Sequence, residues 1–133
     1  MFRLTKIEGG RINVFEPEFI EASAIEITEG EALSVNNGKL VKCAQTAKPT
    51  FIALETVSAQ DANRIIPVGR VESNQVYEVP LSVSITSAVV VGAKLTIGSD
   101  ALTVTATTTD GVATVVSTNG ASVAGDTVLV RFA

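Results

Sequence analysis

Histidine and tryptophan are absent from this 133-residue sequence, and cysteine and tyrosine occur once each. Without histidine the chain lacks the usual general base at neutral pH, the commonest nitrogen ligand of zinc, and the partner of a serine or cysteine nucleophile. Sugar-binding sites usually stack rings on exposed tryptophan or tyrosine, and this chain offers only Tyr77. These absences remove most hydrolase mechanisms and weigh against a carbohydrate-binding domain, so we expect a protein that is not an enzyme and needs no cofactor.

Charge is also scarce, at 18% of the residues, and the formal net charge is -4. An acidic chain is poorly suited to binding a phosphate backbone through general electrostatics. No apolar run approaches the roughly 18 residues of a membrane span, and the N-terminal MFRLTKIEGGRINVF lacks the apolar core of a signal peptide. The single Cys43 has no partner for an internal disulfide, which fits a reducing compartment. We therefore expect no nucleic-acid or membrane partner, and synthesis in a cytoplasm.

The chain is rich in short runs of Val, Ala, Leu and Ile that are separated by Ser, Thr, Gly and Asn. Branched residues favour strands, and a turn every 8 to 12 residues or so is typical of sandwiches and small barrels. Turn dipeptides that tolerate positive φ occur at Asn37-Gly38, Asp110-Gly111 and Asn119-Gly120. The sequence predicts an all-β fold with strands at 24–28, 32–35, 39–44, 50–55, 64–68, 76–81, 88–91, 94–97, 101–106, 112–117 and 127–132. Only residues 17–23 are interpreted as a single helical turn.

The second half of the chain repeats the first at a spacing of 62 residues, the distance from Gly30 to Gly92. The aligned pairs include Leu33 with Leu95, Val35 with Ile97, Leu40 with Leu102 and Val68 with Val130. Because the order of turns and strands also matches, we expect two related β-lobes, small barrels or sandwich-like, at 24–80 and 81–133, after an N-terminal arm or first strand at 1–23. The alternative is one fused sandwich whose two halves match by chance.

The two halves differ in charge. After Pro80 the only charged residues are Lys94, Asp100, Asp110, Asp126 and Arg131. Segments such as 81–86 and 102–105 alternate apolar residues with Ser or Thr, which places the hydroxyls on one face of a strand. A weakly charged sheet with long open edges would pair with copies of itself. We therefore expect these edges to be closed in a barrel or covered in an oligomer.

Three sets of residues remain as candidates for chemistry. Paired carboxylates for a glycosidase would come from Glu16, Glu18, Glu21, Glu26, Glu29 and Glu31, whose clustering near turns favours a solvated acidic face. Asp100, Asp110 and Asp126 lie in predicted turns, where Asp caps its own backbone, and their spacing matches no calcium-binding loop. Cys43 adjoins Lys42, which could lower a thiol pKa, but without a histidine or second cysteine a packing role is favoured. We predict no catalytic, cofactor-binding or metal-binding residue.

The run EGEALSVNNGKLVKCA (29–44), followed by PTFIALE (49–55), resembles the capsid decoration, or cement, proteins of tailed bacteriophages. The later runs VGAKLTI (91–97) and GDTVLVRF (125–132) are similar to the way such chains end. The resemblance implies a non-enzymatic structural protein that binds the outer surface of an assembled phage head and stabilises it by bridging neighbouring capsid subunits. Its implied partners are the major capsid protein and copies of itself, commonly as a homotrimer, and its implied location is the outer capsid surface of the virion.

The capsid-docking hypothesis falls on the segment before the first repeat. Its apolar residues have no repeat counterpart, and its basic side chains suit acidic capsid residues. The candidates are Phe2, Arg3, Leu4, Lys6, Ile7, Arg11, Ile12, Val14 and Phe15. We expect that deleting residues 2–15 leaves a folded domain that no longer binds capsids. The alternative for the segment is a first strand that completes the fold, and the alternative for the protein is a head-fibre, tail-associated or adhesin-type module for display or host attachment.

Overall fold

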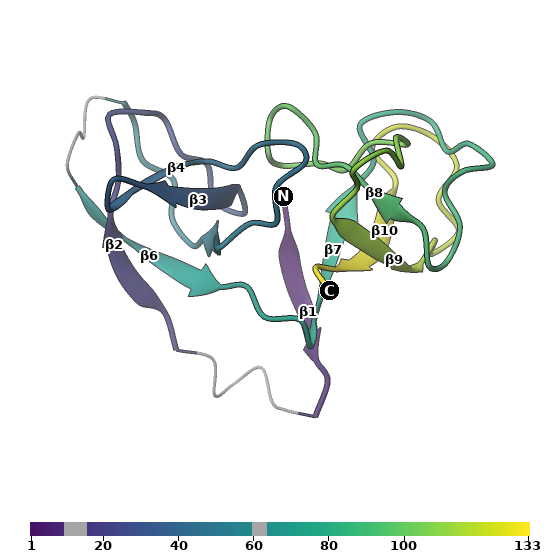
Figure 1. Ribbon diagram of the computed structural model, residues 1–133, viewed down its shortest axis with the longest axis horizontal. Helices are drawn as coiled ribbons and strands as arrows, with labels where there is room; N and C mark the ends of the chain where they lie inside the picture. The colour runs from purple at the N-terminus through teal and green to yellow at the C-terminus, as the bar shows by residue number, and fades with distance from the viewer. Residues whose placement is uncertain (10–15, 60–63) are drawn as a thin grey trace.

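The computed structural model describes residues 1–9, 16–59 and 64–133, which form ten strands and no helix (Figure 1). The strands make two antiparallel sheets of five, and neither sheet closes into a barrel. Sheet β2-β6-β5-β3-β4 contains β2 (Glu18–Glu21), β3 (Ala32–Asn36), β4 (Lys39–Lys42), β5 (Phe51–Ala53) and β6 (Ile65–Arg70). Sheet β1-β7-β10-β9-β8 contains β1 (Arg3–Ile7), β7 (Gln75–Pro80), β8 (Lys94–Leu95), β9 (Ala113–Ser117) and β10 (Thr127–Arg131). The all-β prediction is confirmed, and we call the parts built on the first and second sheets lobe 1 and lobe 2.

Lobe 2 repeats the strand pairing of lobe 1. The strands β3, β5 and β6 of lobe 1 correspond to β8, β9 and β10 of lobe 2. Residue partners at the 62-residue spacing are the same: Ala32 with Ile52 and Lys94 with Thr114, Leu33 with Phe51 and Leu95 with Ala113, and Ala53 with Val68 and Val115 with Val130. A chance likeness of composition would not preserve register, because a slip of one residue turns every side chain to the other face. The repeat is therefore structural.

The edge strands β2 and β7 also correspond, at a shorter spacing than the rest of the repeat. Glu18 faces Val68 and Tyr77 faces Val130, so β2 and β7 are related by 59 residues. Just beyond them, Ala22 forms a parallel bridge with Leu40, as Leu81 does with Val104. The duplicated units thus begin at β2 and β7, earlier than the ungapped sequence repeat suggests, because lobe 2 has three extra residues between the bridge and the next strand.

Each lobe has a buried apolar core, and the core of lobe 2 extends between the lobes. The core of lobe 1 is centred on Leu33, Leu40, Ile66 and Val68. The larger core contains the equivalent Leu95, Val104, Val128 and Val130, together with Ala32, Cys43, Ile52 and Val71 from lobe 1. Two backbone hydrogen bonds cross the same junction, from Ala32 N to Ala101 O at 2.8 Å and from Ile97 N to Gln45 O at 2.9 Å. The lobes are therefore packed against each other and are not joined by a free linker.

Several predicted elements are wrong. Residues 24–28, 88–91 and 101–106 are not strands: Ile27 and Val104 form only isolated bridges, and 88–91 has no strand partner. Residues 17–23 do not form a helical turn, because Glu18–Glu21 is β2 and pairs with β6. Ile20 of β2 packs against the core of lobe 1, and this tertiary contact decides the conformation of a short segment with no strong preference of its own.

Candidate functional site

Phe2, the first of the predicted docking residues, lies in the core. Its side chain is 2% exposed, and its ring centroid lies 5.5 Å from that of Phe132 and 6.4 Å from that of Tyr77. Its N–H donates to the carbonyl of Gly30 in lobe 1 at 2.8 Å. Phe2 therefore holds the two lobes together, and in this fold its ring is not available to a capsid. The result favours the alternative that the segment is a first strand.

The strand β1 covers the outer edge of β7, where Arg3 faces Glu78 and Leu4 faces Tyr77 (Figure 1). An ion pair joins Arg3 to Glu78 at 2.7 Å, and Leu4 packs against the larger core. Lys6 and Arg3 are exposed, whereas Leu4 and Ile7 are half-buried. The remaining docking candidates, Arg11, Ile12, Val14 and Phe15, lie outside the described residues. Of the described candidates, Arg3 and Lys6 are the ones whose side chains can meet a partner.

The end of β1 is fastened to the last strand. Arg131 of β10 donates two hydrogen bonds to the carboxylate of Glu8, at 2.5 and 3.0 Å, and the Glu8 N–H donates to the carbonyl of Asn74 at 2.8 Å. With the buried ring of Phe2 at its other end, the segment from Phe2 to Glu8 is part of the fold. Deleting residues 2–15 would remove an edge strand and a core aromatic residue, so the deletion tests folding together with docking.

A pocket of about 230 Å³ opens where β1 meets lobe 1. Its walls are mostly apolar and its rim carries Arg3 and Glu29; the apolar lining consists of Met1, Phe2, Leu4, Gly30, Ile52, Ala53, Leu54, Gly69 and Tyr77. Catalytic and ligand sites normally add a few convergent polar groups to an apolar pocket. The tyrosine hydroxyl here is already engaged, since it donates to the side-chain oxygen of Gln75 at 2.6 Å. The pocket can accept an apolar side chain, but it provides no reactive group.

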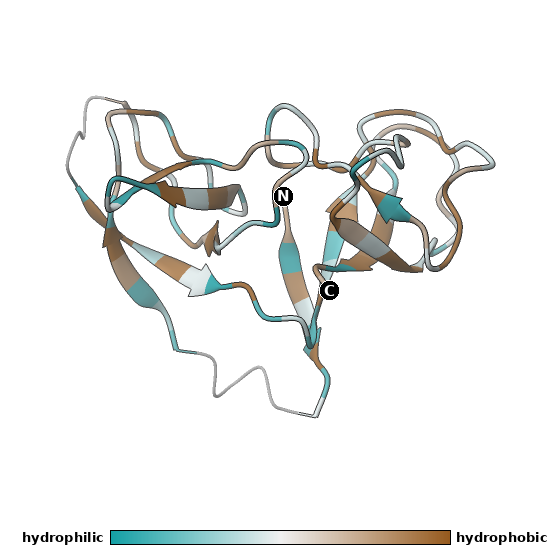
Figure 2. Ribbon diagram, viewed as in Figure 1, coloured by the Kyte–Doolittle hydropathy of each residue, from teal (hydrophilic) through white to brown (hydrophobic). Residues whose placement is uncertain are grey.

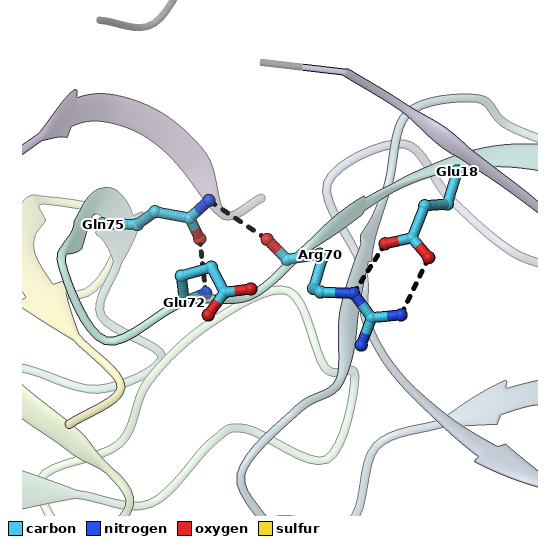
Figure 3. Close-up of polar contacts among 4 residues, drawn as sticks. All are labelled: Glu18, Arg70, Glu72 and Gln75. Atoms are coloured by element: carbon cyan, nitrogen blue, oxygen red, sulfur yellow. Dashed lines mark hydrogen bonds and ion pairs between the residues drawn. The ribbon is translucent and has the colours of Figure 1, made fainter. Parts of the chain in front are cut away.

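Polar contacts fix the chain where it passes from lobe 1 to lobe 2 (Figure 3). Arg70 at the end of β6 donates two hydrogen bonds to Glu18 of β2, at 2.7 and 2.8 Å. The buried amide of Gln75 donates to the carbonyl of Arg70 at 3.1 Å and accepts from the N–H of Glu72 at 2.8 Å. Since every hydrogen bond of this network lies between β2, β6 and the start of β7, its role is to hold the crossover in one conformation.

Glu31 is the one ionisable side chain among the described residues that is both deeply buried and incompletely paired. It is 2% exposed, and its Oε2 atom has no hydrogen-bond partner. Burial raises the pKa of Glu31 to about 7, against the opposing effect of the Lys42 ammonium, whose Nζ lies 4.0 Å from Oε1. Its equivalent in lobe 2 is Ala93. No second acid, base or nucleophile contacts Glu31, so it affects stability and does not form a catalytic pair.

The other glutamates considered for a glycosidase are placed on the surface. Glu18 is held by Arg70, and this hydrogen bonding lowers its pKa, while Glu21 lies 3.6 Å from Lys39. Glu16, Glu26 and Glu29 are exposed. Exposed ion pairs of this kind contribute about 0 to 1 kcal/mol. A solvated acidic face, as predicted, accounts for these residues except Glu31.

The aspartate and cysteine predictions are confirmed in their local geometry. The Asp100 carboxylate accepts from the Leu102 N–H at 2.9 Å, and that of Asp126 accepts from the N–H groups of Ser122 and Val123 at 2.9 and 3.1 Å. Cys43 is buried, with its thiol donating to the carbonyl of Ala47 at 3.2 Å. Burial raises the pKa of this thiol, which is the opposite of the activation that a nucleophile needs.

Among residues 1–9, 16–59 and 64–133, no three His, Cys, Asp or Glu side chains are arranged to hold a metal ion. The same part of the chain contains no helix long and apolar enough to cross a membrane. No protein-family model, curated protein or solved structure matches the sequence or the fold of this chain. The function must therefore be argued from the residues and their arrangement.

Sequence reasoning missed two features of this molecule that bear on function. The burial of Glu31 was signalled only by its position two residues before the inward-facing Leu33, since alternate residues of a strand share a face. The exposure of Val90 and Val91, at 53% and 67%, had no such signal, because a run of valines is more typical of a buried strand.

Proposed function

We propose that this chain is a non-enzymatic structural protein that binds the outer surface of an assembled bacteriophage capsid and stabilises it by bridging neighbouring capsid subunits. The observation that carries the proposal is the duplication, in which two lobes with the same strand registers are locked together. Such a body presents two related surfaces at a fixed separation. That arrangement suits contact with two neighbouring subunits of a regular shell.

The lock between the lobes is what makes bridging effective. The shared core, the Phe2 N–H bonded to Gly30 and the Gln75 network all resist movement of one lobe relative to the other. When one lobe is bound, a rigid junction keeps the other at a high effective concentration beside its own subunit. Two modest contacts then oppose the separation of the subunits, and binding to the assembled state raises the temperature at which the shell opens.

The sequence resemblance to decoration proteins supplies the identity of the target, and the charges suggest how the target is recognised. The segment that starts at β1 carries the exposed basic residues Arg3 and Lys6 on an otherwise acidic chain. We assign capsid docking to this side of the molecule, with acidic residues of the major capsid protein as its counterpart. Attraction between such charges weakens as salt is added.

The test is co-sedimentation of the protein with undecorated phage heads, at low and at high salt. We expect binding that saturates at a regular stoichiometry, and we expect the Lys6→Glu variant to bind more weakly at low salt. Lys94→Glu, at an exposed lysine of lobe 2, is the matched control. If the protein stays in the supernatant as an elongated oligomer, the capsid proposal fails and a head-fibre or attachment module takes its place.

A further inference from the structure

The end of lobe 2 that lies away from lobe 1 is formed by two long connections, residues 82–91 and 118–125, which we call the neutral tip. Two hydrogen bonds hold the connections together, from Ile85 N to Ser122 O at 3.0 Å and from Gly125 N to Leu81 O at 2.9 Å. They run side by side at the right-hand end of the molecule in Figure 1. Neither connection contains a charged residue.

Large apolar side chains project from the neutral tip. The exposed fractions are 43% for Val83, 53% for Val90, 67% for Val91 and 55% for Val123. Val83 and Val123 lie between the two hydrogen bonds that join the connections, so they belong to the same part of the surface. Figure 2 shows stretches of hydrophobic colour along this end of lobe 2. An exposed apolar cluster of this kind is typical of a surface that is covered by another protein.

The duplication shows that the fold does not require such a surface. In lobe 1 the equivalent connections, 22–30 and 54–64, carry Glu26, Glu29, Glu55 and Arg64, and the last two form an ion pair at 2.5 Å. The same architecture is therefore compatible with a charged, solvated end. Lobe 2 has replaced those charges with valine, serine, threonine and alanine, so the neutral tip reflects a property of lobe 2 that its backbone does not explain.

We propose that the neutral tip is the surface through which copies of this chain associate. The charges argue for a second copy as the occupant. Each copy has a net charge of -4, so copies repel each other at most approaches, and an uncharged end is where two of them meet with the least repulsion. A surface without either sign offers nothing by which a charged partner could be selected, whereas identical apolar tips are compatible with each other.

This inference does not depend on capsid binding, because the tip and the basic β1 side belong to different parts of the molecule. The experiment measures the mass of the full chain in solution by light scattering and sedimentation equilibrium, over a range of protein concentrations and at low and high salt. The variants are Val91→Glu and Val83→Glu. Val35→Glu is the matched control, because Val35 of lobe 1 is also a strand-flanking valine and is 43% exposed, like Val83.

We expect the wild-type protein to associate beyond the 13.8 kDa monomer, at high salt as well as at low salt. Each tip variant should weaken association by about tenfold or more, as for a central interface residue. Val35→Glu should associate like wild type. Circular dichroism confirms that each variant is folded, and Val91→Thr, which keeps the branched shape without a charge, should retain most of the association.

Three results would overturn the proposal. The first is a wild-type protein that stays monomeric at every concentration, and the second is an oligomer that Val35→Glu weakens as much as Val91→Glu does. The third is a monomer whose binding to phage heads is lost in Val91→Glu, which would make the tip a capsid contact. Loss of head binding with self-association intact would instead refute the proposed capsid function and leave the role of the tip standing.

Discussion

Replacing Glu31 by Gln is expected to stabilise the protein at and above neutral pH. The Glu31 carboxylate is 2% exposed, one of its oxygens has no hydrogen-bond partner, and its counter-ion Lys42 is 4.0 Å away with a half-exposed side chain. Burial raises the pKa of Glu31 from 4.5 to about 7. At about 1.4 kcal/mol per pKa unit, ionisation of this group opposes folding by about 3 kcal/mol above that pH. Because a buried amide also lacks partners, we expect Glu31→Gln to recover about 1 to 2 kcal/mol of this.

The sign of the effect gives it a pH window. The pKa of Glu31 is higher in the folded state than in the unfolded state, so the folded state binds more protons between pH 4.5 and about 7, and stability falls as the pH rises through that window. Below the window the carboxyl is neutral in both states and the penalty is absent. The neighbouring Glu26 and Asp100 add to the upward shift, while Lys42 and the Thr28 N–H oppose it.

Urea unfolding of wild type and Glu31→Gln at about pH 5 and about pH 8 measures the effect. The difference in the free energy of unfolding should be small at the lower pH and largest at the higher one. Glu29→Gln, at an exposed glutamate two residues earlier, should show no such pH dependence. A Glu31→Gln protein that is less stable than wild type at the higher pH would refute the reasoning, since the pair with Lys42 would then outweigh the cost of burial.

Three further predictions test the packing. Phe2→Ala should lower the free energy of unfolding by about 3 to 5 kcal/mol, because it removes a ring that is 2% exposed; a loss below 1 kcal/mol or so would mean that the N-terminus is not packed as described. Cys43 should react with a thiol reagent only as fast as the protein unfolds, because burial raises its pKa, and rapid labelling of the folded protein would contradict this. Gly111→Ala should lower the melting temperature, since the added Cβ would lie 1.9 Å from the Lys94 carbonyl, with a cost of about 1 to 3 kcal/mol. An unchanged melting temperature would show that the turn can move away from β8.

The parts of the fold that sequence could predict are those fixed by local chemistry. The Asn37-Gly38 turn is an example: both residues have positive φ, at 51° and 77°, and the hairpin of β3 and β4 follows from it. The strands with clear alternation, such as β10, were also predicted, because their inward and outward residues are set by the period of a strand. These features depend on a few adjacent residues.

The missed features depend on partners far away in the sequence. Residues 24–28 and 88–91 each bury one apolar side chain, Ile27 and Val89, and this resembles a strand although no continuous ladder forms. The burial of Phe2 is set by Tyr77 and Phe132, at the far side of the chain. Residues before the first repeat had no counterpart to indicate their place, so the docking hypothesis treated as an exposed arm what is in part an edge strand.

The duplication also explains why self-association would use the neutral tip and not a sheet edge. The two lobes carry equivalent outer strands, β7 and β2, whose open edges would each be a template for pairing with another chain. On β7 that edge is covered by β1, with Lys6 facing Val76. At the position equivalent to Val76, the strand entering β2 has Pro17, which has no N–H to donate. One edge is therefore occupied and the other is a poor partner, which leaves the uncharged valines of lobe 2 as the apolar surface on which copies can meet.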